Sequence, residues 1–168
     1  GLRDDALALV PAAGGSRQRE RLLLGLQQLE ARGGVPGEPR LRPVWERIAA
    51  DDLVVMLGDF LDPASVSLAT RLAGARREVL AIQLLTVGER DFDFEGGRRF
   101  RDPETGEELP ADPRALRSEF LARFGQAQRA LAARLDEAGI RHTRYVLDED
   151  PLQPLRALFA DAPGAPGA

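Results

Sequence analysis

Residues 53–62 read LVVMLGDFLD, and they decide the fold that we expect for this chain. Leu53–Leu57 is an unbroken apolar run with two β-branched residues, which is typical of a central strand buried on both faces of a parallel sheet. Asp59 follows this run closely, where the carboxyl end of the strand would meet solvent. Ligands of open α/β sheets bind just beyond such strand ends. The stretch therefore predicts a central strand and a candidate site at its end.

A helix and a second strand follow this stretch. Pro63–Ala75 carries apolar residues at helical spacing, and Glu78–Thr86 (EVLAIQLLT) is another long apolar run. Strands that alternate with helices imply a mostly parallel sheet with helices on its faces. The fold class that we expect is therefore α/β, with a Rossmann-like sheet.

The residues upstream predict one more strand and two helices. Ala6–Val10 (ALALV) is a short apolar run that predicts a buried strand. Ser16 is the expected N-cap of a helix over Arg17–Ala31, and Leu41–Ala50 predicts a shorter helix. The Gly- and Pro-rich residues 33–39 between these two helices predict a loop.

The residues downstream interrupt this alternation once before they resume it. Gly88–Asp112 contains a turn signal, Asp-Pro-Glu-Thr-Gly, between two short extended pieces, and predicts an inserted β-hairpin. Pro113–Ala138 has an apolar stripe and predicts the longest helix, which Gly139 ends. Arg141–Leu147 predicts the last strand, and Pro151–Phe159 predicts a closing helix.

The composition limits the function classes. The 168 residues are 43% hydrophobic and 30% charged, so we expect one domain over residues 1–160 and a disordered tail over 161–168. The absence of Cys excludes thiol chemistry, and all 23 basic residues are Arg, which excludes a catalytic lysine. The net charge of −4 argues against a nucleic-acid partner, and no apolar run reaches the ~20 residues of a membrane span. Because the chain begins with Gly1, we expect a piece of a longer protein.

Three stretches together carry a family resemblance. They are LVVMLGDFLD, EVLAIQLLTVGERDFDFEGGRRFRDPETGEEL and RYVLDEDPLQPLRALF, with a long helix before the last. The chain resembles the C-terminal half of bacterial domain-of-unknown-function 58 proteins, which are similar to von Willebrand factor A domains. The resemblance covers most of residues 4–160, and FEGGRRFRDPETGEEL is its most specific part.

This resemblance implies a metal-ion-dependent adhesion site that is degenerate here. The family site takes an Asp-x-Ser-x-Ser loop after the first strand, a Thr from a second loop and an Asp after the fourth strand. Asp59 matches the last of these, but the sequence has no Asp-x-Ser-x-Ser, and Gly33-Gly34-Val35 stands where the resemblance places the Thr. A single carboxylate binds Mg²⁺ or Mn²⁺ weakly, because affinity rises with the number of charged ligands. We therefore expect no resident cofactor.

The resemblance also raises a question about the first strand. If Ala6–Val10 corresponds to the family's second strand, the usual central first strand is missing, which leaves an unpaired edge inside the sheet. Three arrangements are open. An upstream strand exists in the full protein, Ala6–Val10 pairs directly with Leu53–Leu57, or a second copy of the chain fills the gap.

The function that we expect is a non-enzymatic protein-interaction module. The resemblance implies assistance in the assembly of protein complexes together with a MoxR-type AAA+ ATPase, in the cytoplasm or anchored on the cytoplasmic side of a membrane. The expected partner-binding surface combines Asp59, Phe60 and Asp62 with Gly33, Gly34 and Val35.

Two alternatives stay open. One is a Mg²⁺- or Mn²⁺-dependent hydrolase or phosphotransferase that uses Asp59 and Asp62, although the sequence lacks a catalytic motif of those enzyme classes. The other is a structural part of a larger membrane-associated protein. His142 is the only histidine, and we interpret it as a structural residue.

Overall fold

The computed structural model describes residues 10–11, 13–29, 35–92, 100–101, 108–109 and 113–159. The expected strand Ala6–Val10, apart from Val10, and the expected tail over 161–168 lie outside the described residues.

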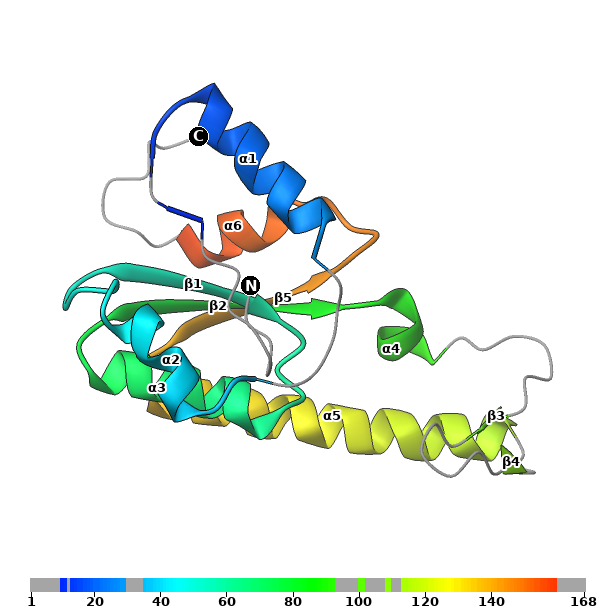
Figure 1. The fold of residues 1–168 in the computed structure, drawn as a ribbon. Helices are drawn as coiled ribbons and strands as arrows, with labels where there is room; N and C mark the ends of the chain where they lie inside the picture. The colour runs from blue at the N-terminus through cyan, green and yellow to red at the C-terminus, as the bar shows by residue number, and fades with distance from the viewer. Residues whose placement is uncertain are drawn as a thin grey trace.

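A three-stranded parallel sheet forms the centre of the molecule (Figure 1). Its strands are β1 (Leu53–Gly58), β2 (Glu78–Leu85) and β5 (Arg141–Val146), in the order β1-β2-β5. All three strands lie at predicted positions, and their parallel pairing confirms the α/β class with helices on both faces.

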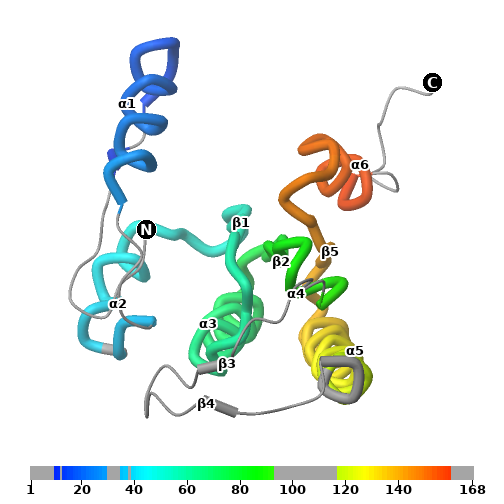
Figure 2. Tube along the Cα trace, turned by 90° about the vertical axis from the view of Figure 1, so that its right-hand side faces the viewer, coloured from blue at the N-terminus to red at the C-terminus, as the bar shows by residue number. Residues whose placement is uncertain are grey.

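Six helices are described, and they lie on both sides of the sheet (Figures 1 and 2). The α3 and α5 helices cover one face, whereas α6 and α1 stand on the other side. Their bounds are α1 Ser16–Gln27, α2 Glu38–Trp45, α3 Pro63–Gly74, α4 Val87–Asp91, α5 Pro113–Glu137 and α6 Gln153–Phe159. The α3, α5 and α6 helices agree with the predicted helices to within two residues at either end.

The hydrophobic core is divided by the sheet into two unequal clusters. The larger cluster joins β2 to α3 and to the C-terminal part of α5, and it includes Ala69, Leu72 and Leu135. The smaller cluster lies on the opposite face, where Leu158 of α6 covers Leu80 and Ile82 of β2. The β2 strand is therefore the one that is buried on both faces.

The prediction that β1 is buried on both faces is wrong for the described residues. Its residues alternate between exposed and half-buried, and Leu57 at its end is 66% exposed. The strand pairs with β2 on one side, and no other described strand pairs with its second side. Among the described strands β1 therefore lies at the edge of the sheet, and only one of its faces reaches the core.

The two N-terminal helices differ from their predicted bounds. Gly15, with a φ of 91°, is the residue before α1, so Ser16 is the first helical residue and not the N-cap. The helix ends at Gln27 rather than at Ala31; it buries no residue, so no packing supports a longer helix. The α2 helix begins at Glu38 and ends at Trp45, because Pro39 favours a helix start and the chain turns after Trp45.

The region predicted as a hairpin contains a helix before the hairpin. The α4 helix begins after Thr86, whose hydroxyl accepts from the Glu89 N–H, while the Glu89 carboxylate accepts from the Thr86 N–H. This capping box is the Thr-x-x-Glu signal that the prediction missed. The hairpin itself is confirmed, since β3 (Phe100–Arg101) pairs antiparallel with β4 (Glu108–Leu109).

Candidate functional site

The loop after β1 forms the first part of the candidate site. Asp59 is exposed, and its Oδ1 accepts a hydrogen bond of 3.1 Å from the Leu61 N–H. Phe60 has a φ of 56°, in the left-handed region, and its side chain is buried in the larger core cluster. The loop therefore presents Asp59 and Leu61, which is 62% exposed, to solvent, while the Phe60 side chain packs into the core.

Asp62 brings two of the predicted contact loops together. Its Oδ1 accepts from the Ala64 N–H at 2.9 Å and so caps α3, while its Oδ2 accepts from the Val35 N–H at 3.3 Å. Val35 and the loop after β1 are thus neighbours, as the prediction required. Gly33 and Gly34 lie outside the described residues.

A buried glutamine of β2 supports this loop through a hydrogen bond, and the sequence did not predict this contact. Gln83 of β2 is 5% exposed, and its side-chain amide donates a hydrogen bond of 2.9 Å to the Asp59 carbonyl. A polar side chain inside an apolar strand is costly unless it is paired, so Gln83 fixes the position of Asp59. A single Gln inside the run EVLAIQLL was the available signal.

The described residues do not form the ligand set of a metal-ion-dependent adhesion site. Val35 offers the loop an N–H where the site needs an oxygen, and the Ser65 hydroxyl donates to the Asp62 carbonyl. Within the described part of the chain, no three His, Asp or Glu side chains gather in a group suited to a metal ion. We derive no chemistry through a metal from these residues.

The outward face of β1 forms the second part of the candidate site. Leu53, Val55 and Leu57, which we call the β1 surface, are 50%, 48% and 66% exposed. Val54 and Met56 point to the larger core cluster, so the β1 surface points to the opposite face of the sheet.

The β1 surface lies on the face that α6 covers only in part. Val55 pairs with Leu80 and Leu57 with Ile82, and in a parallel pair such residues share a face. Leu80 and Ile82 are 1% and 4% exposed because α6 packs over them, but on this face of the sheet Val55 and Leu57 of β1 remain 48% and 66% exposed. The apolar face of the sheet is therefore half covered.

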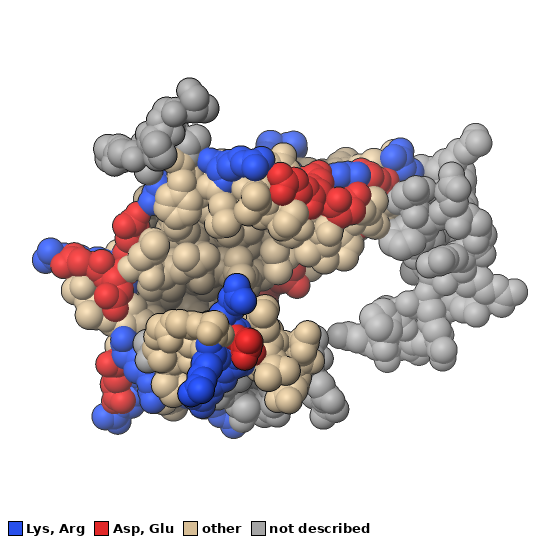
Figure 3. Space-filling view, turned by 90° about the horizontal axis from the view of Figure 1, so that it is seen from above, with Lys and Arg blue, Asp and Glu red and all other residues tan. Residues whose placement is uncertain are grey.

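More exposed leucines stand on the same side of the sheet. The α1 helix buries no residue, and four of its leucines are 44–61% exposed: Leu22, Leu23, Leu24 and Leu26. Figure 3 looks onto this side and shows an uncharged central area with charged side chains gathered along its margins. Exposed apolar patches with polar margins are typical of surfaces that bind other proteins.

Because β1 has a free edge among the described residues, the question of the first strand stays open. Of Ala6–Val10, the structure describes Val10 alone. The pairing of this stretch with β1 therefore stays a prediction. Among the described helices, none is both long and apolar enough to cross a membrane.

One family model and several curated proteins match this chain. The model of the family described as protein of unknown function DUF58 matches residues 1–130. Uncharacterized proteins of Mycobacterium bovis and Mycobacterium tuberculosis are 33% identical over 138 residues, which is 77% of this chain. The chain spans 42% of the length of these curated relatives.

One solved structure has a weak likeness to this chain. The crystal structure of a universal stress protein family member from Burkholderia pseudomallei matches with a TM-score of 0.30 and 16% identity, covering 66% of this chain and 74% of that one. This score is too low to assign a shared fold. The match to the family model covers most of the sequence, including the loop after β1 and the strand that positions it, and the chain therefore belongs to the DUF58 family.

Proposed function

We propose that this chain is a von Willebrand factor A-like domain that acts as a non-enzymatic protein-interaction module. The partner that we propose is a MoxR-type AAA+ ATPase, in the cytoplasm, and the family resemblance is the basis for that choice. The three-stranded parallel sheet flanked by helices is compatible with a fold of this type.

The observation that supports an interaction role is the half-covered face of the sheet. The β1 surface presents three aliphatic side chains that are each about half exposed or more, on a strand with a free edge among the described residues. A free edge also offers unpaired backbone N–H and C=O groups to a strand of another protein. Burial of the β1 surface by a partner would remove this apolar area from water.

The loop after β1 extends this contact surface at the carboxyl end of the strand. Leu61 is 62% exposed, and the Asp59 carboxylate beside it is exposed as well. An apolar side chain next to a fixed negative charge suits a partner surface that pairs an apolar pocket with an Arg or Lys. Such a pairing gives the orientation of the complex, whereas the β1 surface gives most of its apolar burial.

Binding to a MoxR-type ATPase from the same genome tests the proposal. We would measure binding to the ATPase without nucleotide, with ADP and with a non-hydrolysable ATP analogue. The double variant Val55→Thr, Leu57→Gln keeps the shape of β1 but makes the β1 surface polar, and it should weaken binding at least tenfold, since burial of one aliphatic side chain is worth about 1.5 kcal/mol or more.

Leu147→Gln is the matched control. Leu147 is 56% exposed and follows β5, on the far side of β2 from β1. It should bind like the unchanged chain. No binding in any nucleotide state would overturn the choice of partner, and equal loss in the double variant and the control would overturn the role of the β1 surface.

A metal-dependent hydrolase or phosphotransferase is the competing proposal, and it has a separate test. Asp59 accepts from a backbone N–H of its own loop, whereas Asp62 caps α3 and accepts from the Val35 N–H, and these are structural tasks. We expect Mg²⁺ and Mn²⁺ at micromolar concentration to leave the melting temperature of the chain unchanged. Stabilisation that the Asp59→Ala variant loses would favour the metal enzyme instead.

A further inference from the structure

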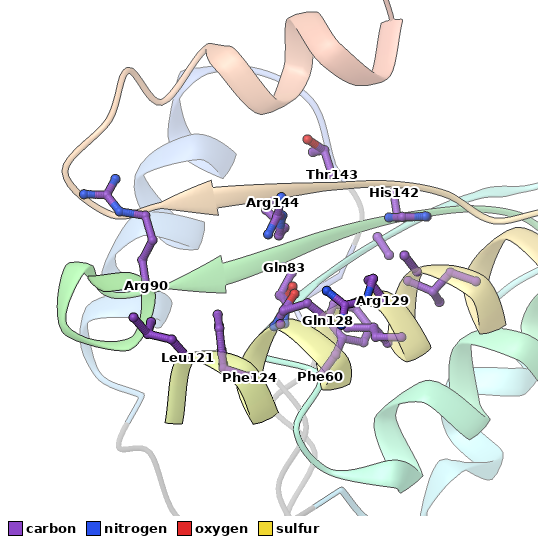
Figure 4. Close-up of a pocket in the computed structure, with 15 residues that line it drawn as sticks. Phe60, Gln83, Arg90, Leu121, Phe124, Gln128, Arg129, His142, Thr143 and Arg144 are labelled. Carbon is purple, nitrogen blue, oxygen red and sulfur yellow. The ribbon is translucent and has the colours of Figure 1, made fainter. Parts of the chain in front are cut away.

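A cavity of about 620 Å³ lies between α5 and the strands β2 and β5 (Figure 4). It opens on the face of the sheet opposite the β1 surface, and the proposed protein interaction does not use it. Its volume is within the range of small-molecule sites, which is roughly 300–1,000 Å³.

The charged residues described as lining this cavity are basic. Three arginines and His142 line it, and none of the fifteen described lining residues is an Asp or Glu. Arg90 is the arginine with partners, because it pairs with Asp91 at 2.6 Å and with Glu149 at 3.1 Å. Figure 4 shows its guanidinium turned toward the turn after β5.

The two other arginines have no such partners among the residues that are described. Arg144 points from β5 toward α5, and Arg129 reaches the cavity from α5 itself (Figure 4). Neither forms an ion pair or hydrogen bond with a described residue. Two like charges that face one cavity repel each other, and a bound anion would relieve that repulsion.

His142 differs from these arginines because it has a carboxylate partner. Its Nε2 lies 3.1 Å from Oδ1 of Asp136 on α5. This contact with Asp136 fixes the imidazole ring, which lines the cavity. Within the described part of the chain, the positive charge that lacks a carboxylate partner therefore comes from Arg129 and Arg144.

Most of the other described lining residues of the cavity are apolar, and Gln83, Gln128 and Thr143 are the uncharged polar ones. Phe60 and Phe124 line it together with aliphatic side chains of α5, including Leu121 and Leu131. Aromatic and aliphatic walls bind the carbon body of a ligand, whereas the polar groups fix its orientation. The cavity thus fits a molecule with one strongly anionic end and an apolar body.

We propose that this cavity binds a small phosphate monoester with an aromatic or aliphatic body, held by Arg129 and Arg144. A phosphate monoester carries nearly two negative charges at neutral pH, which matches two guanidinium groups better than a carboxylate does. The planar guanidinium also donates two parallel hydrogen bonds to phosphate oxygens. Arg129 and Arg144 are exposed to solvent, so the ligand has a path to them.

Calorimetry with phenyl phosphate tests this proposal, with inorganic phosphate and phenol as the two halves of the ligand. Phenyl phosphate should bind at least tenfold more tightly than inorganic phosphate, and phenol should not bind. Arg129→Gln and Arg144→Gln should each weaken phenyl phosphate about tenfold, because each removes a charged hydrogen-bond donor. Arg134→Gln, on the same helix but outside the cavity lining, should bind like the unchanged chain.

An NMR titration of the unchanged chain keeps the proposal testable if a variant fails to fold. Phenyl phosphate should shift the amide signals of Gly125 and Thr143, which line the cavity, and leave those of the β1 surface in place. No binding of phenyl phosphate at millimolar concentration, or equal loss in the Arg134 control, would overturn the site. If inorganic phosphate bound as tightly as phenyl phosphate, the proposal that the cavity recognises the apolar body of the ligand would be wrong.

Discussion

Asp62 joins two loops that are separated by 27 residues along the chain. One carboxylate oxygen caps the first turn of α3, and the other accepts from the backbone of Val35. A carboxylate suits both tasks because it only accepts hydrogen bonds and its negative charge is favourable at a helix N-terminus. The geometry of the candidate site therefore depends on this residue more than on Asp59, whose hydrogen bond stays within its own loop.

Asp62→Ala should lower the free energy of unfolding by about 1–2 kcal/mol, because it removes the cap of α3 and the acceptor for Val35. Asp62→Asn keeps an acceptor oxygen for the cap and should cost less than half as much. Urea unfolding of both variants measures this difference. If the Asn variant were as unstable as the Ala variant, capping would not explain the effect.

The contact between Arg90 and Asp91 predicts a dependence on pH. Its hydrogen bond lowers the pKa of the Asp91 carboxyl below the ordinary value, so folding favours the charged form. This stabilisation is present above the ordinary Asp pKa, about 3.9, and is lost as the pH falls through the lowered value.

Asp91→Asn removes the titrating group and should make stability less dependent on pH as the pH falls below the ordinary Asp pKa, about 3.9. The urea midpoint at several pH values measures the effect, with the unchanged chain as reference. Because the pair is partly exposed, high salt should reduce the difference between the two proteins. Parallel pH curves for the two proteins would contradict this explanation.

Two helices end in the same backbone motif with different residues. In α5, Gly139 N–H bonds to the Asp136 carbonyl and Ile140 N–H to the Leu135 carbonyl. After α3, Arg76 and Arg77 make the equivalent bonds to Ala73 and Leu72. The left-handed residue is Gly139, with a φ of 68°, in one case and Arg76, with a φ of 64°, in the other. Only glycine adopts this conformation without strain.

Substitutions at the two helix ends should therefore change the stability of the chain in opposite directions. Gly139→Ala should destabilise the chain by about 1 kcal/mol, and Arg76→Gly should stabilise it by about 0.5–1 kcal/mol. Arg76→Ala is the control for loss of the side chain, including its exposed ion pair with Asp51, and should bring no gain. Thermal and urea unfolding measure all three. If Arg76→Ala stabilised the chain as much as Arg76→Gly, loss of the arginine side chain, and not relief of backbone strain, would explain the gain in stability.

The sequence predicted the positions of helices and strands better than it predicted their burial and tertiary contacts. The apolar runs at β1 and β2 and the stripe of α5 were sufficient for the parallel sheet, because period and length are local properties. The burial of β1 was not predictable from the run itself, since LVVML reads the same at the centre of a sheet and at its edge. Likewise, Asp59 and Val35 could be named from sequence, but the link through Asp62 depends on tertiary structure.

Burial is uneven across the described part of the chain. The β2 strand is buried on both faces, whereas α1 buries no residue and its 12 residues are too few for a stable isolated helix in water. Figure 2 shows α1 standing apart from the sheet on the side of the β1 surface. The least supported helix and the half-covered face of the sheet therefore occur on the same side, where the proposed partner would bind.

Hydrogen exchange should reveal this difference directly. The amides of α1 should exchange through local opening, with protection at least a hundredfold below that of β2, because little apolar area is lost when α1 unfolds alone. Addition of the proposed ATPase should slow exchange in β1 and leave β2 unchanged, since β2 is already covered on both faces. The α3 helix serves as the internal reference, because four of its residues are buried and it lies on the other face. Protection of α1 equal to that of β2 in the free chain would contradict this interpretation, because it would show that α1 packs tightly in solution.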